Sequence, residues 1–184
     1  MASKTMAGTI RTFISIDVPI TDEIKNIVDR VRHIRNVKSV SVKQIHITLR
    51  FLGCTDERRL PELCSRLQSK FEGFGRFDVS VKGTGVFPDA KRPRVVWMGV
   101  ESPEPLIKAS RMVTEVLDEM GLDYDRKAFS PHITIGRVNG KAELDDVLMM
   151  QRIFSQFTCT EIKVMGSELR PTGAVHTVIG TVKL

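Results

Sequence analysis

Hydrophobic and polar residues along the chain form two kinds of pattern, one typical of strands and one typical of helices. Residues 77–82 alternate strictly between apolar and polar, as expected for a strand with one face in water. Apolar residues over 24–31 follow helical spacing, and Thr21 before them is a good N-cap. The same reasoning predicts strands over 13–18, 45–52, 77–82, 95–100, 132–138, 157–164 and 175–182, and helices over 22–35, 57–71, 104–120 and 143–153. Gly83 and Gly85 are expected to interrupt the third strand.

The order of these elements repeats along the chain. The first half runs strand, helix, strand, helix, strand from residue 13 to 82, and the second half repeats the same types from 95 to 164. A period of about 85 residues is too long for a solenoid. The repeat instead favours an α+β protein of two lobes related by a pseudo-twofold axis, and a cleft between lobes is a favoured place for a ligand.

One short phrase occurs in the third element of each half: His46-Ile47-Thr48-Leu49 and His132-Ile133-Thr134-Ile135. Residues two apart on a strand share a face, so each half presents one imidazole and one hydroxyl together. The pseudo-twofold axis would bring the two pairs face to face. The alternate residues are expected in the core, namely Ile45, Ile47, Leu49 and Phe51 in the first strand and Ile133 and Ile135 in the second.

Two imidazoles and two hydroxyls around one point suit chemistry at phosphorus. Histidines can serve as general base and general acid near neutral pH, and threonine hydroxyls can donate to phosphate oxygens. Arg50 continues the face of His46 and Thr48 and could neutralise a phosphate. Strict alternation puts Arg137 on the wrong face, but Gly136 could mark a bulge that re-aims it. The pattern predicts in-line displacement at phosphorus without a metal or a covalent enzyme intermediate.

Composition narrows the class of protein. The 184 residues are 41% hydrophobic and 27% charged, as in an ordinary globular protein, and the net charge of +6 is compatible with a polyanionic partner. No apolar run approaches a membrane span, and the first residues lack the apolar core of a secretory signal. Three cysteines without regular spacing indicate a reduced cytoplasmic protein. No HExxH, HxH or CxxC motif is present, so neither a metal nor a cofactor is expected.

The two histidine motifs and their flanks resemble the 2H phosphoesterases, and within them the RNA 2′,3′-cyclic phosphodiesterases, also called 2′-5′ RNA ligases. The resemblance spans residues 10–182 and is carried by Arg11–Asp17, His46–Gly53, Pro93–Gly99, Phe129–Val138 and Ser167–Gly173. It implies a bilobal fold with antiparallel sheets lining a cleft, formed by residues 1–184 as one domain, with 1–8 as a flexible extension. One departure is His176, where the family often has a tyrosine. From the residues alone, His176 is expected at the strand surface or cleft rim without chemistry.

The resemblance also implies an activity and residue roles. The activity is opening of a 2′,3′-cyclic phosphate at an RNA end to a 2′-phosphate, by a protein expected to act as a monomer on RNA ends such as those of tRNA fragments. His46 would protonate the leaving 3′ oxygen, His132 would activate water, and Thr48, Thr134 and Arg137 would hold the phosphate. The residues themselves leave open which histidine is the acid, because the two motifs are symmetric.

Three other functions remain open at this point. The same groups could join RNA ends through 2′-5′ linkages by microscopic reversibility. The chain could be a non-catalytic RNA-binding module on the same fold, although all four motif positions are intact. It could also act on a small substrate, such as ADP-ribose 1″,2″-cyclic phosphate or a 2′-5′ oligonucleotide.

Overall fold

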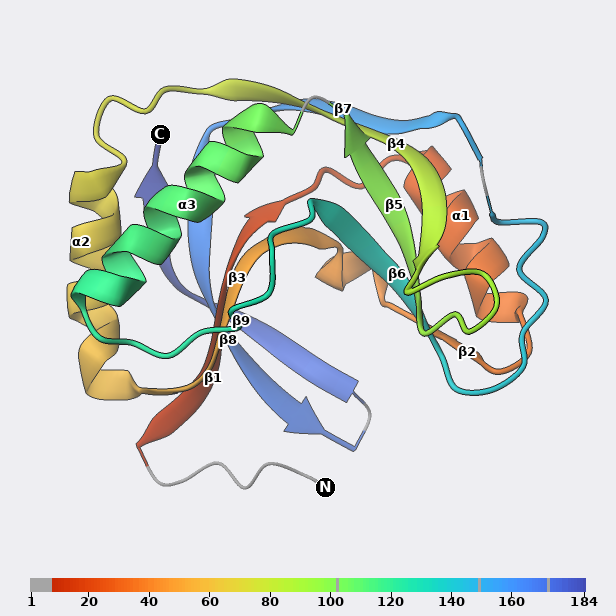
Figure 1. Ribbon diagram of the computed structural model, residues 1–184, viewed down its shortest axis with the longest axis horizontal. Helices are drawn as coiled ribbons and strands as arrows, with labels where there is room; N and C mark the ends of the chain where they lie inside the picture. The colour runs from red at the N-terminus through yellow and green to blue at the C-terminus, as the bar shows by residue number, and fades with distance from the viewer. Residues whose placement is uncertain (1–7, 102, 149, 172) are drawn as a thin grey trace.

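Two antiparallel sheets with helices outside them form the architecture, as expected for an α+β protein (Figure 1). The computed structural model describes residues 8–101, 103–148, 150–171 and 173–184. The helices are α1 (Asp22–His33), α2 (Leu60–Lys70) and α3 (Glu104–Glu119), with short 3₁₀ turns η1 (Val42–Gln44) and η2 (Glu57–Arg59). The strands are β1 (Thr9–Asp17), β2 (Val37–Ser39), β3 (His46–Asp56), β4 (Phe77–Phe87), β5 (Val95–Glu101), β6 (His132–Val138), β7 (Ile153–Cys159), β8 (Glu161–Arg170) and β9 (Gly173–Lys183).

The two sheets repeat one order of strands. The first sheet runs β3-β1-β8-β9, and the second runs β6-β5-β4-β7 with β2 added beside β6. Apart from the added β2, each motif strand therefore has the equivalent place in its sheet, beside the strand that opens its half of the chain, as the pseudo-twofold interpretation requires. The two lobes are not, however, the two halves of the chain. The strand β4 belongs to the second sheet, while β8 and β9 return to the first.

The helices are also exchanged between the lobes. The helix α1 follows β1 of the first sheet but packs on β2, β6 and β7 of the second, and α3 follows β5 of the second sheet but packs on β3 of the first. Thr21 caps α1 by accepting a hydrogen bond from the backbone N–H of Ile24 at 3.2 Å. The apolar stripe of α1 is buried, as its spacing predicted: Ile24, Ile27, Val28 and Val31.

Three expectations about individual elements were wrong. The described residues of 143–153 form no helix: the carbonyl of Leu144 accepts from the N–H groups of Val147 and Leu148, which closes a single turn. Thr84 on β4 forms hydrogen bonds to this segment. Its hydroxyl donates to the Val147 carbonyl at 2.6 Å and accepts from the Met150 N–H at 3.1 Å. Tertiary hydrogen bonds thus replace helical ones.

The other two errors concern strand boundaries. The expected strand over 157–164 is two strands, β7 and β8, which separate at Thr160 and lie in different sheets. The strand β4 continues through Gly83 and Gly85 to Phe87, and the expected interruption is limited to a shift of its register with β5 between Val81 and Thr84. The expected flexible extension lies outside the described residues except for Gly8, whose carbonyl accepts a hydrogen bond from the N–H of Glu57.

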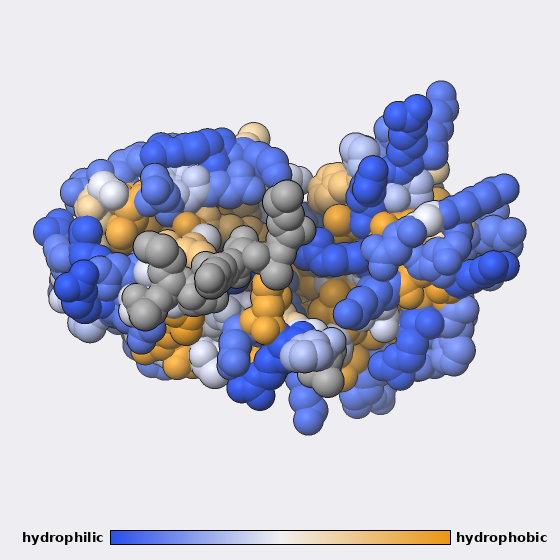
Figure 2. Space-filling model, turned by 90° about the horizontal axis from the view of Figure 1, so that it is seen from below, coloured by the Kyte–Doolittle hydropathy of each residue, from blue (hydrophilic) through white to orange (hydrophobic). Residues whose placement is uncertain are grey.

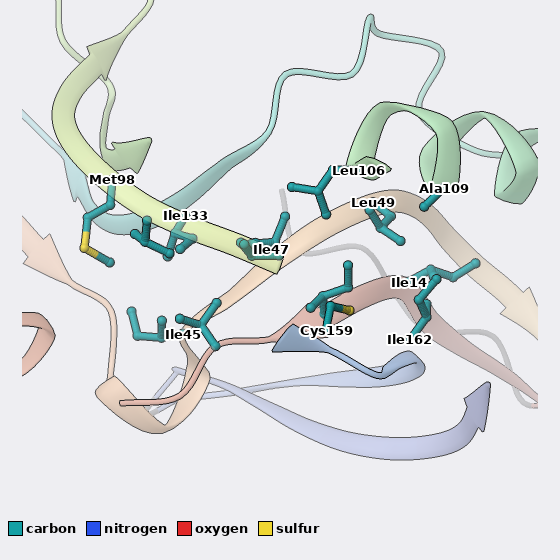
Figure 3. Close-up of a cluster of buried hydrophobic side chains, with 14 of the residues drawn as sticks. Ile14, Ile45, Ile47, Leu49, Met98, Leu106, Ala109, Ile133, Cys159 and Ile162 are labelled. Atoms are coloured by element: carbon teal, nitrogen blue, oxygen red, sulfur yellow. The ribbon is translucent and has the colours of Figure 1, made fainter. Parts of the chain in front are cut away.

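One buried cluster lies between the sheets and the helices. Figure 3 shows side chains from both sheets in it, with Ile47 of β3 and Ile133 of β6 in the same view, each fully buried. On the face seen in Figure 2, hydrophilic side chains predominate and hydrophobic ones form separate patches between them. No helix in the described part of the chain is both long enough and apolar enough to span a membrane.

Candidate active site

The two motif histidines are held in the same way. Each is the first residue of its strand, and each Nδ1 lies 2.7 Å from the backbone carbonyl two residues earlier, that of Gln44 for His46 and that of Ser130 for His132. A carbonyl only accepts, so Nδ1 carries the hydrogen in both rings. Nε2 is left as the nitrogen that can take or give a proton.

The expected alternation of the motif strands is confirmed. His46, Thr48, His132 and Thr134 are half-buried, and Ile47, Leu49, Ile133 and Ile135 between them are buried. The imidazole of His132 is the smallest of the causes that act on the pKa of His46, and the strands β3 and β6 contact one another, so the two motifs lie in the same part of the molecule.

A bulge follows the threonine in both motif strands. In the first sheet Ser15 pairs with Thr48 but Ile14 pairs with Arg50, so Leu49 is the extra residue. In the second sheet Trp97 pairs with Thr134 but Val96 pairs with Gly136, so Ile135 is the extra residue. A bulge shifts the alternation, so the residues that follow it in each strand point to the face opposite to the one expected from strict alternation.

In the second motif the bulge brings Arg137 to the face of His132 and Thr134, as Gly136 suggested. Gly136 and Val138 are buried, and Arg137 between them is exposed. A Cβ on Gly136 would lie 2.7 Å from Val31 and 2.9 Å from Val37, so this position faces α1 at close range. Glycine is needed there because the helix lies against the strand.

In the first motif the same bulge turns Arg50 away from the histidine, contrary to expectation. Its Nε donates to the hydroxyl of Thr114 on α3 at 2.9 Å, and its Nη1 donates to the carbonyl of Lys127 at 2.9 Å. Arg50 therefore holds the loop that leads to the second motif, and its guanidinium is already occupied by protein groups.

Phe51 takes the position in β3 that Arg137 takes in β6. It was expected in the core, but 49% of its side chain is exposed. Its ring lies 5.8 Å from that of Phe13, its cross-strand partner, and the Phe13 ring stacks on the imidazole of His46 at 4.9 Å. An open aromatic face is therefore continuous with the ring contacts of the first motif.

Aromatic side chains surround both histidines, and the sequence reasoning missed them as part of the site. Phe87 meets His132 edge-on at 5.0 Å and lies 5.2 Å from Trp97. A Cβ on Gly85 would lie 2.3 Å from the Trp97 ring, so this glycine makes room for the indole. The available signal was the alternation of Phe87, Gly85 and Trp97 on neighbouring strands, but strand pairing was needed to read it.

Burial lowers the pKa of His46 below its usual value. The hydrogen bond to the Gln44 carbonyl and the charge of Asp17 raise this pKa, while the imidazoles of His176 and His132 lower it further. His176 was expected at a rim without chemistry, and the structure places its ring 5.5 Å from that of His46.

Two buried polar atoms beside the motif threonines have no hydrogen-bond partner among the described residues. They are the hydroxyl of Ser15, which pairs with Thr48, and the indole nitrogen of Trp97, which pairs with Thr134. Unpartnered buried donors are uncommon and call for an explanation. Both lie next to the groups that the sequence pattern assigned to a phosphate.

The hollows in the protein surface lie away from the motif residues. Two shallow hollows, one between α1 and β7 and one over β4, β5 and β7, contain none of the motif residues. Within the described residues, no three His, Cys, Asp or Glu side chains are grouped so as to hold a metal ion.

Comparisons with known proteins show the family of this chain. Two relatives named RNA 2′,3′-cyclic phosphodiesterase are 32% identical over 177 residues (Methanothermobacter thermautotrophicus; 91% of this chain, 95% of the relative) and 33% identical over 175 residues (Thermotoga maritima; 92% and 93%). A crystal structure of a Thermus thermophilus protein superimposes with a TM-score of 0.81 at 26% identity, covering 95% of this chain and 98% of that one. The model of the 2′-5′ RNA ligase superfamily matches residues 20–170. The chain belongs to this superfamily of 2H phosphoesterases.

Proposed function

We propose that this protein hydrolyses 2′,3′-cyclic phosphates at RNA ends to 2′-phosphomonoesters. The observation that carries the proposal is the matched pair of imidazoles on equivalent strands, each with Nδ1–H bound to a carbonyl and Nε2 without a hydrogen bond to any described residue. One Nε2 can hold a proton to give while the other accepts one, which is what hydrolysis of a phosphodiester needs. The names of the relatives supply the substrate class.

His132 is the general base and His46 the general acid in this proposal. Nε2 of His132 takes a proton from water as the water oxygen bonds to phosphorus. The bond from phosphorus to the 3′ oxygen breaks, and that oxygen takes the proton from Nε2 of His46. The phosphate stays on the 2′ oxygen. Exchange of one proton at each ring with solvent restores the starting state, and joining of RNA ends would use the same groups in reverse.

Thr48, Thr134 and Arg137 hold the phosphate. The hydroxyls follow the histidines on the same faces, and the bulge adds the guanidinium of Arg137 to the second face. A guanidinium can donate two parallel hydrogen bonds to a phosphate, which steadies the charge that develops during displacement. Arg50 is not part of this set, because its guanidinium is bonded to α3 and to the loop that follows α3.

Phe51 offers a place for the terminal nucleobase. Stacking on an exposed aromatic face tolerates any base, since every base has a π-face. The position suits this role because the ring contacts run from Phe51 through Phe13 to His46.

Three further expectations stay predictions from the sequence: that the protein acts as a monomer, that it acts in the cytoplasm, and that it acts on tRNA fragments.

In this proposal Lys38 contacts the RNA upstream of its end. It is exposed and lies directly across from Arg137 in the pairing of β2 and β6. Like charges opposite one another destabilise a sheet, and neither cation forms an ion pair within the described residues. A polyanion would relieve this repulsion.

We expect Lys38→Gln to lower kcat/KM several-fold on a trinucleotide with a cyclic phosphate end. The slope of log(kcat/KM) against the logarithm of the salt concentration should become shallower by about one. A 2′,3′-cyclic mononucleotide lacks the upstream phosphate, so its turnover should not change. Lys108→Gln is the matched control, since Lys108 lies over Phe74 and away from the motifs. Equal losses on both substrates would contradict an upstream contact.

The pH dependence should be bell-shaped, because one histidine must be neutral while the other is protonated. The pKa of His46 is lowered, so as the pH rises His46 loses its proton at a lower pH than an ordinary histidine does. A bound phosphate anion stabilises the protonated form. The alkaline limb of kcat/KM, which reports the free enzyme, should therefore lie at lower pH than that of kcat. Steady-state rates across about pH 5 to 9 test this, and a flat profile would count against two histidines.

The decisive experiment is phosphorus NMR of an oligoribonucleotide with a 2′,3′-cyclic phosphate end, incubated with the protein in excess EDTA. A 2′-phosphomonoester is the expected product. A 3′-phosphate would overturn the assignment of the leaving oxygen. No turnover by folded protein would overturn the proposed reaction and leave the small cyclic nucleotides and the non-catalytic module as candidates.

A further inference from the structure

His176 is a third imidazole beside the motif histidines. It lies on β9, and its ring meets that of His46 edge-on, with 5.5 Å between centroids and 74° between planes. It also meets the ring of Phe13 at 4.9 Å and 67°. Phe13 and His46 are themselves stacked, so the three rings form one cluster, and His176 is the member contributed by the last strand of the chain.

The ring nitrogens of His176 have no protein partner among the described residues. The other three histidines, His33, His46 and His132, each place Nδ1 within 2.8 Å of a backbone carbonyl. The His176 ring is half-buried, and burial lowers its pKa, so it is neutral at neutral pH with one nitrogen as donor and the other as acceptor. A partly buried polar ring without partners is available to a ligand or to water.

The fold sets the position of His176 relative to His46 through one residue. The carbonyl of Gln44 accepts the Nδ1–H of His46, and the side-chain amide of Gln44 donates to the carbonyl of Ala174, two residues before His176. Pairing of His176 with Ser167 on β8 fixes its register. The two imidazoles are thus positioned through the same residue, Gln44 at the end of η1.

We propose that His176 is a substrate-binding residue, whose free ring nitrogen hydrogen-bonds the ribose-phosphate end of the nucleotide on the side of the leaving 3′ oxygen. The inference rests on the proposed function, which gives His46 to that oxygen. His176 lies against His46 and belongs to the opposite sheet from His132. Its neutral form also avoids placing a second cation beside a protonated His46.

His176→Phe is the test, because phenylalanine keeps the ring contacts with Phe13 and His46 and removes both nitrogens. We expect kcat/KM on a cyclic-phosphate-ended dinucleotide to fall about tenfold while the unfolding temperature stays unchanged. His176→Gln restores a hydrogen-bonding group and should recover part of the loss. His33→Phe on α1 is the matched control and should behave as wild type. Wild-type rates in His176→Phe, or no recovery in His176→Gln, would overturn the proposal.

Two further measurements locate the contact and separate it from the proposed reaction. Equal losses with adenosine and uridine 2′,3′-cyclic phosphates place the contact on the ribose-phosphate end, whereas a loss with one base only would overturn that placement. Affinity for adenosine 2′-monophosphate, measured by calorimetry, does not depend on turnover. It should weaken in His176→Phe by a factor similar to the loss in kcat/KM. If wild type binds this nucleotide more tightly than His176→Phe does but hydrolyses no cyclic phosphate, the proposed function fails and the His176 contact stands. Unchanged affinity in His176→Phe overturns the contact.

Discussion

Replacing His46 or His132 with asparagine is expected to reduce kcat/KM by about 10³-fold or more. Asparagine can still place an N–H where Nδ1 lies and donate to the carbonyl of Gln44 or Ser130, so the strand start is preserved. It has nothing in place of Nε2, and general acid or base catalysis typically contributes 10² to 10⁴ in rate. The measurement is single-turnover hydrolysis of a cyclic-phosphate-ended dinucleotide, with circular dichroism to confirm folding.

His33→Asn is the control for this pair. His33 lies exposed on α1, where its Nδ1 also contacts a carbonyl, that of Asp29, at 2.8 Å. It shares the local geometry of the motif histidines but not their location, so full activity is expected. Substantial activity in either motif variant would show that the corresponding imidazole is not an essential acid or base.

Arg137→Gln and Arg50→Gln should have opposite signatures, although both arginines follow a motif threonine closely. Arg137 is exposed, with no ion pair among the described residues, so we expect a loss of about 10² to 10³ in kcat/KM with an unchanged unfolding temperature. Arg50 holds Thr114 and the Lys127 carbonyl. Its loss should lower the unfolding temperature by about 3–6 °C, from hydrogen bonds to a charged group.

Thermal unfolding and steady-state kinetics on the two variants decide between these roles. If Arg50→Gln lost activity at full stability while Arg137→Gln unfolded early, the assignment of the two arginines would be reversed. Addition of guanidinium to Arg137→Gln offers a further check. A small cation can fill the vacated place at an open phosphate site and recover part of the rate.

The contrast between these arginines shows where sequence reasoning succeeds and where it stops. Alternation placed His46, Thr48, His132 and Thr134 correctly, because a strand has a fixed period of two. The bulge in β6 could be suspected because Gly136 interrupts the motif. The same bulge in β3 carries Arg50 instead of glycine, so nothing in the local sequence marks it. Because Leu49 is an extra residue in the pairing, Phe51 lies on the face of His46 where Arg50 was expected.

Long-range contacts account for the other errors. Leu144 and Val147 are spaced as in a helix and are buried as a helix would bury them. Thr84, more than sixty residues earlier, supplies the hydrogen bonds that keep this segment out of a helix. The membership of β4, β8 and β9 in their sheets likewise depends on pairing partners far along the chain. His176 was placed at a rim because its neighbours His46 and Phe13 are brought to it by two different strands.

The exchange of strands between the sheets means that this protein has no removable half. A cut in the loop before β5 would leave each fragment with strands of both sheets and with unpaired edges in each. We therefore expect one cooperative unfolding transition and no minimal enzyme made from either motif alone. Each motif thus depends for its folding on strands supplied by the other half of the chain.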